Sequence, residues 1–149
     1  MANTIPNVTA PQYTGPLAVV SFPRSGSRTV VKNIAKAVNK KPALGVLHTP
    51  EYFGENNYNV KEIVFSHEYV LHGHWHTIND LEDEIKDEIH NNYKIIDIVR
   101  HPADIIKSLS KIVGDENVLN IYYDALYKTL KAKKDWDIYK TIIFEEYFT

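Results

Sequence analysis

The side chains best suited to chemistry lie in a short polar turn between an apolar run, Leu17 to Phe22, and a segment of helical spacing, Ser27 to about Asn39. A turn that opens a helix leaves backbone N–H groups unpaired, and the helix dipole favours negative charge there. Guanidinium and hydroxyl groups also donate hydrogen bonds to oxyanions. The stretch therefore predicts a strand, an anion-binding loop and a helix. The residues expected to hold the anion are Arg24, Ser25, Gly26, Ser27, Arg28 and Thr29.

A second group of polar residues follows the apolar run Lys94 to Val99, which predicts another strand. Arg100 lies at the end of that strand, and Pro102 is well placed to open a helix that carries Ser108. If the helix folds back along the sheet, Arg100 and Ser108 reach one second anion. Two anion sites indicate a ligand with two phosphate-type groups.

The loop departs from the consensus of nucleoside triphosphatases, G-x-x-x-x-G-K-[ST]. No glycine lies five residues before Gly26, and Arg28 rather than a lysine–serine pair follows Ser27. A typical magnesium-dependent ATPase loop is therefore disfavoured.

Together these stretches resemble the sulfotransferase family that uses 3′-phosphoadenosine 5′-phosphosulfate (PAPS). Phe22-Pro23-Arg24-Ser25-Gly26-Ser27 is similar to the family's 5′-phosphosulfate loop, and Ile98-Val99-Arg100-His101-Pro102-Ala103-Asp104, with Ser108, to its 3′-phosphate motif. A weaker match is Ile143-Phe144-Glu145-Glu146. The resemblance covers about Leu17 to the C-terminus. It implies transfer of a sulfuryl group from PAPS, as co-substrate, to a hydroxyl or amine of a small-molecule or glycan acceptor, with no metal.

The resemblance also implies catalytic roles for two residues. Arg24 stands where many family members have lysine and is expected to act as an electrostatic clamp, because arginine does not give up its proton. The family often has a base in a segment similar to K-T-H-L-P, and the register of His72-Gly73-His74-Trp75-His76 suggests His74 as base. His76 departs from this pattern, since proline is usual there. The three histidines would share one face of a strand, so zinc binding is the alternative.

Two other functions remain open at this point. Family members are usually longer, so the chain is a minimal enzyme, a fragment, or a non-catalytic module for PAPS or adenosine 3′,5′-bisphosphate. A nucleotide kinase-like phosphotransferase is the third possibility.

Strand and helix patterns alternate along the rest of the chain. Further strands are expected at 43–47, 63–65, 69–74 and 141–144, and helices after Asp80 and over 116–132. This alternation predicts an α/β fold similar to P-loop nucleotide kinases, with a mainly parallel central sheet between flanking helices. Residues 1–16 are expected to be an extended N-terminal segment, and 17–149 one sulfotransferase-like nucleotide-binding domain. Ligands of such sheets bind beyond the carboxyl ends of the strands.

Composition limits the partners. The 149 residues include no cysteine, and the net charge of −2 argues against a broad nucleic-acid-binding face. No apolar run approaches a membrane span, so a soluble, cytoplasmic protein is expected, with its oligomeric state open. The segment from His48 to Asn59 is expected to lie over the pocket, and aromatic residues are candidates for an acceptor pocket: Tyr52, Phe53, Tyr58 and Trp75.

Overall fold

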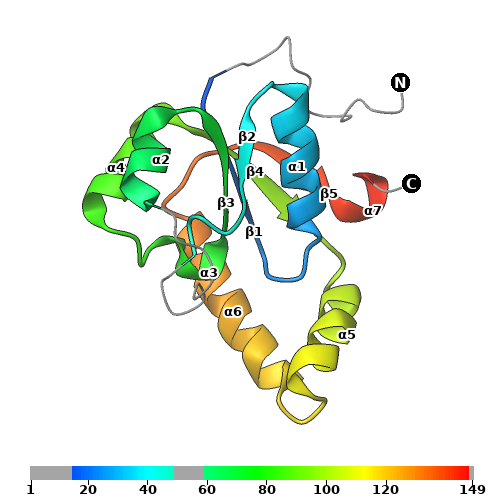
Figure 1. Cartoon of the computed structure of the whole chain (residues 1–149). Helices are drawn as coiled ribbons and strands as arrows, with labels where there is room; N and C mark the ends of the chain where they lie inside the picture. Colours follow the sequence, from blue (N-terminus) through cyan, green and yellow to red (C-terminus); the bar gives the residue numbers. More distant parts are fainter. Residues whose placement is uncertain (1–14, 49–58, 148–149) are drawn as a thin grey trace.

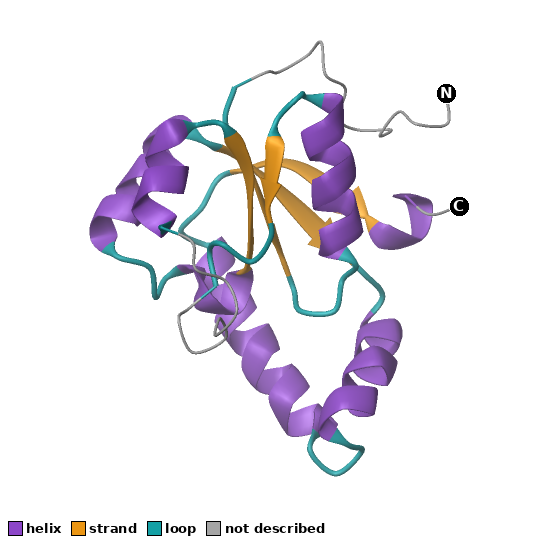
Figure 2. Cartoon of the chain, in the orientation of Figure 1, coloured by secondary structure: helices purple, strands orange, loops and turns teal. Residues whose placement is uncertain are grey.

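Five parallel strands form one sheet in the order β2-β3-β1-β4-β5 (Figure 2). The structure is a computed structural model that describes residues 15–48 and 59–147. The strands are β1 Leu17–Ser21, β2 Lys41–Ala43, β3 Tyr69–His74, β4 Lys94–Val99 and β5 Ile138–Ile143. The central strand β1 leads into the anion-binding loop, and its neighbours β3 and β4 end at His74 and next to Arg100. The two polar motifs therefore meet at the carboxyl edge of the sheet.

Helices cover both faces of the sheet. They are α1 Ser27–Ala37, α2 Val60–Ser66, α3 Trp75–Ile78, α4 Asp83–Asn92, α5 Pro102–Val113, α6 Val118–Lys133 and α7 Phe144–Tyr147. Leu17 and Val19 of β1 pack in a core cluster with α1, whereas Ala18 and Val20 pack in another with α2, α3, α4 and part of α6. This alternation follows from the strand period of two residues. The predicted fold class is confirmed.

Several expected elements differ from those observed. The second strand is Lys41–Ala43 rather than 43–47, and residues 63–65, expected as a strand, lie within α2. Asn59 caps that helix, since its side chain accepts the N–H of Glu62. The expected final strand at 141–144 begins earlier, at Ile138, and gives way at Phe144 to α7.

Helices α5 and α6 form a hairpin that projects beyond the carboxyl ends of the strands (Figure 1). A small core cluster joins the hairpin to the body through Phe22 of the loop and Tyr122 of α6, whose rings lie 5.3 Å apart. Ile112 follows the apolar spacing of α5, yet it is 61% exposed because it lies outside this cluster.

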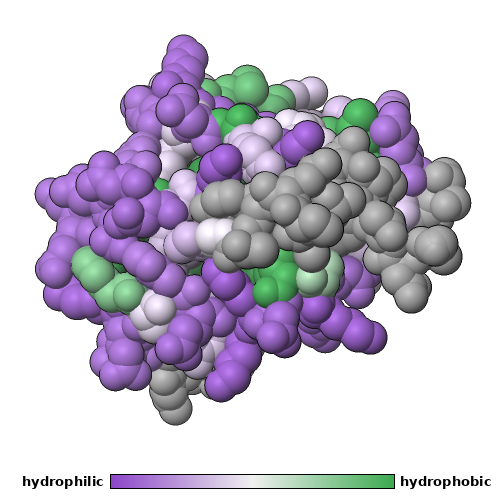
Figure 3. All heavy atoms as spheres, turned by 90° about the horizontal axis from the view of Figure 1, so that it is seen from above, coloured by the Kyte–Doolittle hydropathy of each residue, from purple (hydrophilic) through white to green (hydrophobic). Residues whose placement is uncertain are grey.

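The face of the molecule seen from above is mainly polar (Figure 3). In the view from above, hydrophilic residues dominate and hydrophobic atoms form small separate patches (Figure 3). Among residues 15–48 and 59–147, no helix has the length and hydropathy that a membrane span requires. The cytoplasmic location and the division at residue 16 stay predictions.

Candidate functional site

The anion-binding loop turns sharply at two residues with positive φ. Gly26 immediately precedes α1 and has φ 74°, and Arg24 has φ 65°. A Cβ at position 26 would collide with the ring of Phe144, so the backbone approaches α7 as only glycine allows. Ser27 is thus the first residue of α1, and the N-terminus of this helix opens at the loop.

The two sequence motifs meet through direct hydrogen bonds. The Nε of Arg24 donates to Ser108 Oγ over 3.1 Å, and Nη1 of Arg100 donates to the carbonyl oxygen of Arg24 over 2.8 Å. The guanidinium of Arg100 also lies 4.3 Å from the ring centroid of Phe144. Residues on the loop, at the end of β4 and on α5 therefore form one cationic group.

These residues line a cavity of about 400 Å³ at the carboxyl edge of the sheet. Its lining, taken from the part of the chain that the structure describes, contains no aspartate or glutamate. The hydroxyl of Ser25 is buried and has no hydrogen-bond partner within that part. A buried polar group without a partner is costly, so this hydroxyl is available to a ligand. The lining residues are Pro23, Arg24, Ser25, Gly26, Ser27, Arg28, Thr29, His48, His72, His74, Arg100, Ser108 and Phe144.

His72 orients the hydroxyl of Ser27. The backbone N–H of Gly45 donates to Nδ1 of His72 over 2.8 Å, so the proton of the neutral ring is on Nε2. That Nε2 lies 2.8 Å from Ser27 Oγ and donates to it, which leaves the Ser27 proton to point toward an anion. Burial, together with the nearby His48 and Arg28, lowers the pKa of His72 to about 3 and keeps the ring neutral. His72 is therefore a positioning residue.

His74 lies at the end of β3, between the rings of His48 and His76, at centroid distances of 4.3 Å and 5.7 Å. Burial, with neighbouring His48, lowers the pKa of His74 well below its ordinary value. Burial likewise lowers the pKa of His48 to about 4. His74 is thus neutral at pH 7, but the lowered pKa also makes it a weaker base than an ordinary histidine, and a bound anion would raise its basicity.

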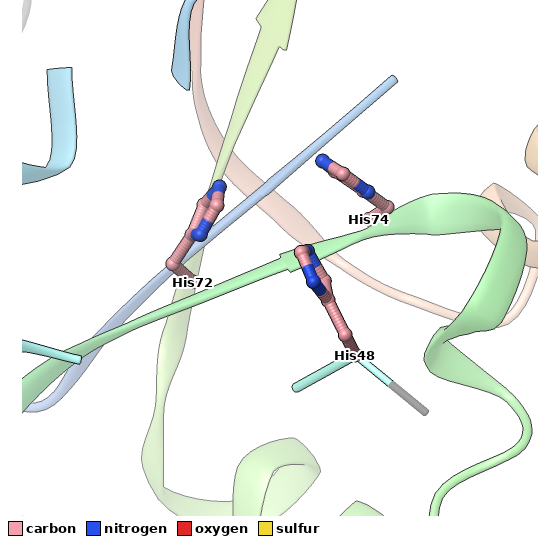
Figure 4. Close-up of side chains that lie close together, drawn as sticks. All are labelled: His48, His72 and His74. Atoms are coloured by element: carbon pink, nitrogen blue, oxygen red, sulfur yellow. The ribbon is translucent and has the colours of Figure 1, made fainter. Parts of the chain in front are cut away.

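The histidines that could form the alternative zinc site differ from those expected from the sequence. The structure brings His48, rather than His76, together with His72 and His74, with one nitrogen of each within 4.8 Å of the others (Figure 4). Coordination by His72 would break its bond to Ser27 or to Gly45. Arg28 adds positive charge next to the trio, which opposes a cation.

Every residue predicted to bind the ligand lines the cavity, from Arg24 to Thr29 and at Arg100 and Ser108, as does the predicted base His74. Trp75, a candidate for the acceptor pocket, is instead fully buried and donates from Nε1 to Asp97 over 2.7 Å. Tyr52, Phe53 and Tyr58 lie outside the described residues. Sequence reasoning placed His48 near the pocket only by its position in the chain. Its partnership with β3 depends on Gly73, where a side chain would collide with Leu47.

Three solved structures share this fold. A shikimate kinase from Bacteroides thetaiotaomicron matches with a TM-score of 0.62 and 15% identity, over 85% of this chain and 84% of that chain. The YorR protein from Bacillus subtilis, in complex with phosphorylated GDP, matches with a TM-score of 0.58 and 14% identity, over 87% and 86%. A gluconokinase from Sinorhizobium meliloti matches with a TM-score of 0.52 and 13% identity, over 91% and 87%.

At these identities the likeness shows the fold alone, which the chain shares with the shikimate kinase and the gluconokinase. No protein-family model and no curated protein sequence matches the chain. None of the three structures is a sulfotransferase, so the resemblance to that family stays a prediction.

Proposed function

We propose that the protein binds a nucleotide with two separate anionic groups and transfers a sulfuryl group from PAPS to an acceptor. The observation that carries this proposal is the meeting of Arg24, Ser108 and Arg100 at one cavity. The loop before α1 and the N-terminus of α1 are suited to bind the phosphosulfate, and Arg100 and Ser108 are suited to bind the 3′-phosphate.

The residues around the reacting group have distinct roles. Ser25, Ser27 and the loop N–H groups donate to the phosphosulfate, and Arg24 and Arg28 stabilise negative charge on the leaving phosphate. The acceptor oxygen forms a bond to sulfur while the bond from sulfur to the bridging oxygen breaks, and the electron pair remains on the phosphate. His74 accepts the proton of the acceptor.

Kinase-like phosphoryl transfer is the second candidate, because the shikimate kinase and the gluconokinase share the fold. The loop opposes it. After its second glycine the consensus has lysine for the β- and γ-phosphates and then a serine or threonine for magnesium, where this chain has Ser27 and Arg28. The cavity lining also provides no carboxylate, among residues that the structure describes, for a magnesium ion.

Calorimetry separates these candidates. Adenosine 3′,5′-bisphosphate is expected to bind more tightly than adenosine 5′-monophosphate, and without magnesium. A preference for ATP with magnesium would favour the kinase. Transfer of labelled sulfate from PAPS to an acceptor panel then distinguishes the enzyme from a non-catalytic binding module.

Arg100→Ala tests the 3′-phosphate assignment. Loss of a charge-assisted hydrogen bond is worth about 1.5–3 kcal/mol, which corresponds to roughly 10- to 100-fold weaker binding of the bisphosphate. Binding of adenosine 5′-phosphosulfate, which lacks the 3′-phosphate, should change little. Lys107→Ala, which removes a similar charge from an exposed position on α5, is the matched control. Equal losses for both nucleotides would falsify the assignment.

A further inference from the structure

A second cavity of about 470 Å³ lies between the anion-binding loop and the α5–α6 hairpin. Its lining is apolar on one side and polar on the other. The apolar residues are Phe22, Pro23, Leu109, Ile112, Ile121 and Ala125, and the polar side, toward the loop and β3, includes Arg24, Arg28, His48, His74 and His76. Ile112 of α5 and Ile121 of α6 line this cavity and are 61% and 41% exposed. The volume is within the range of pockets for small organic ligands.

The second cavity adjoins the first. Arg24, Arg28, His48 and His74 line both, so the predicted base stands at the junction. A molecule in the second cavity therefore presents one end to His74 and to the loop.

The polar side chains that α3 and the hairpin bring to the second cavity, Thr77, Asp124 and Lys128, already have partners. Asp124 pairs with Lys128 over 3.1 Å, and the hydroxyl of Thr77 donates to the carbonyl oxygen of His74 over 3.4 Å. A sugar with many hydroxyls needs many free donors and acceptors, and burying them without partners is costly. The walls instead favour an apolar body, whose burial releases water.

We propose that this cavity binds the acceptor, and that the acceptor is a phenol or alcohol with an aromatic or aliphatic body rather than a glycan. The body packs between Leu109, Ile112 and Ile121, and the hydroxyl faces His74. The role as acceptor rests on the proposed sulfuryl transfer, whereas the apolar binding site does not.

Equilibrium dialysis of the full chain with 2-naphthol tests the binding site without any nucleotide, and glucose serves as the polar comparison. Ile112→Ser and Ile121→Ser each replace an apolar side chain of the cavity lining with a small polar one. Because both positions are exposed, the variants are expected to fold. Each should weaken 2-naphthol binding by about 10-fold, given about 25 cal/mol per Å² of apolar contact. Leu119→Ser, on α6 and 51% exposed but outside the cavity lining, is the matched control and should bind like the unchanged protein.

The outcomes separate this inference from the proposed function. Binding of 2-naphthol that both isoleucine variants weaken and Leu119→Ser does not supports the site, whatever nucleotide the protein prefers. Absent binding, tighter binding of glucose, or equal affinity in all variants overturns it. Adenosine 3′,5′-bisphosphate affinity, measured on the same variants, should not change. If that nucleotide fails to bind any form of the protein, the proposed sulfuryl transfer fails while the apolar site stands.

Discussion

The arrangement of Ser27 and His72 gives a buried histidine a role in binding rather than in proton transfer. Both ring nitrogens of His72 are engaged, with Gly45 and with Ser27, and the side chain is only 1% exposed. Such a ring cannot reach an acceptor. It does determine which way the Ser27 hydroxyl donates, and a fixed donor needs no reorganisation when the anion arrives.

A double-mutant cycle tests this coupling. Ser27→Ala and His72→Phe are each expected to weaken binding of adenosine 3′,5′-bisphosphate by about 1 kcal/mol, the value of a typical hydrogen bond. Because both act through the same hydroxyl, the double variant should lose less than the sum of the two losses. Calorimetry measures the four affinities of the cycle: the unchanged protein, the two single variants and the double variant. Ser110→Ala is the control, because the Ser110 hydroxyl donates to the carbonyl oxygen of Lys107 in its own helix. Additive losses would show that His72 and Ser27 act independently.

The same histidine predicts a dependence of stability on pH. In the folded protein His72 has a pKa of about 3, below its ordinary value of 6.5, so the unfolded chain binds a proton that the folded chain does not. The stability that neutral His72 provides is therefore present above pH 6.5 and is lost as pH falls from there toward 3. The expected slope is about 1.4 kcal/mol per pH unit from this residue. Urea denaturation at several pH values measures it, and His72→Phe should reduce the slope by about this amount. A free energy of unfolding that does not change between pH 6.5 and 4.5 contradicts the expectation.

At the residue scale, the sequence predicted what is local. Arg24 to Thr29 lie within one turn, and the strand before Arg100 and the helix that carries Ser108 are short and regular, so their meeting at one sheet edge follows from parallel topology. The grouping of His48 with His72 and His74 could not be predicted. It depends on contacts that the segment following β2 makes with strand β3. One of these is the hydrogen bond from the Leu47 N–H to the carbonyl oxygen of His72, two residues that are distant in the sequence.

At the scale of elements, the junction of loop and α1 is the most demanding turn in the site. Gly26 combines a positive φ with close contact to Phe144 of α7. Gly114, which ends α5, has a positive φ of 85° but nothing within 4 Å of the position of a Cβ. A side chain at Gly114 would therefore cause backbone strain alone, whereas one at Gly26 would cause backbone strain and also collide with Phe144.

Gly26→Ala is expected to destabilise the protein more than Gly114→Ala. The backbone strain of an added side chain is about 1 kcal/mol at Gly26, which is in the left-handed helical region, and about 1–3 kcal/mol at Gly114, whose φ of 85° and ψ of 153° are almost confined to glycine. Only Gly26→Ala also displaces Phe144, and with it the ring under Arg100, so a further loss of about 1–3 kcal/mol is expected. Urea denaturation measures both variants, and the affinity for adenosine 3′,5′-bisphosphate should fall only in Gly26→Ala. Similar stability for the two variants would mean that α7 yields to the added methyl group.

The elements that sequence reasoning placed wrongly have weak local signals. Ile63-Val64-Phe65 is a short apolar run, which fits a strand or a buried helix equally well by periodicity. Asn59 is the N-cap of α2, because its side chain accepts the N–H of Glu62, and this N-cap pattern is the local signal for a helix here. Ile112 follows the apolar stripe of α5 but lies outside the core cluster that buries Ile105 and Leu109, and only the tertiary structure shows which part of such a stripe is covered.

At the scale of the whole molecule, one buried carboxylate connects the sheet to the hairpin. Asp97 of β4 is 2% exposed and accepts from Trp75 Nε1 and from Lys133 Nζ, each over 2.7 Å. Trp75 begins α3 directly after His74, and Lys133 ends α6. The network therefore joins the strand before Arg100, the helix after the predicted base and the helix that walls the second cavity.

Asp97→Ala should consequently affect the whole fold rather than the site alone. It leaves the buried Trp75 N–H without a partner and the half-buried Lys133 ammonium without its counter-ion, and removing one member of a buried pair typically costs about 3–5 kcal/mol. Because the lysine is partly accessible to water, the loss in the free energy of unfolding is expected at the lower end, about 3 kcal/mol. Asp124→Ala removes an exposed carboxylate paired with Lys128 on α6 and should cost only about 0.5 kcal/mol. Urea denaturation of the two variants measures the difference, and a loss of less than 1 kcal/mol in Asp97→Ala would show that α6 is held by apolar contacts alone.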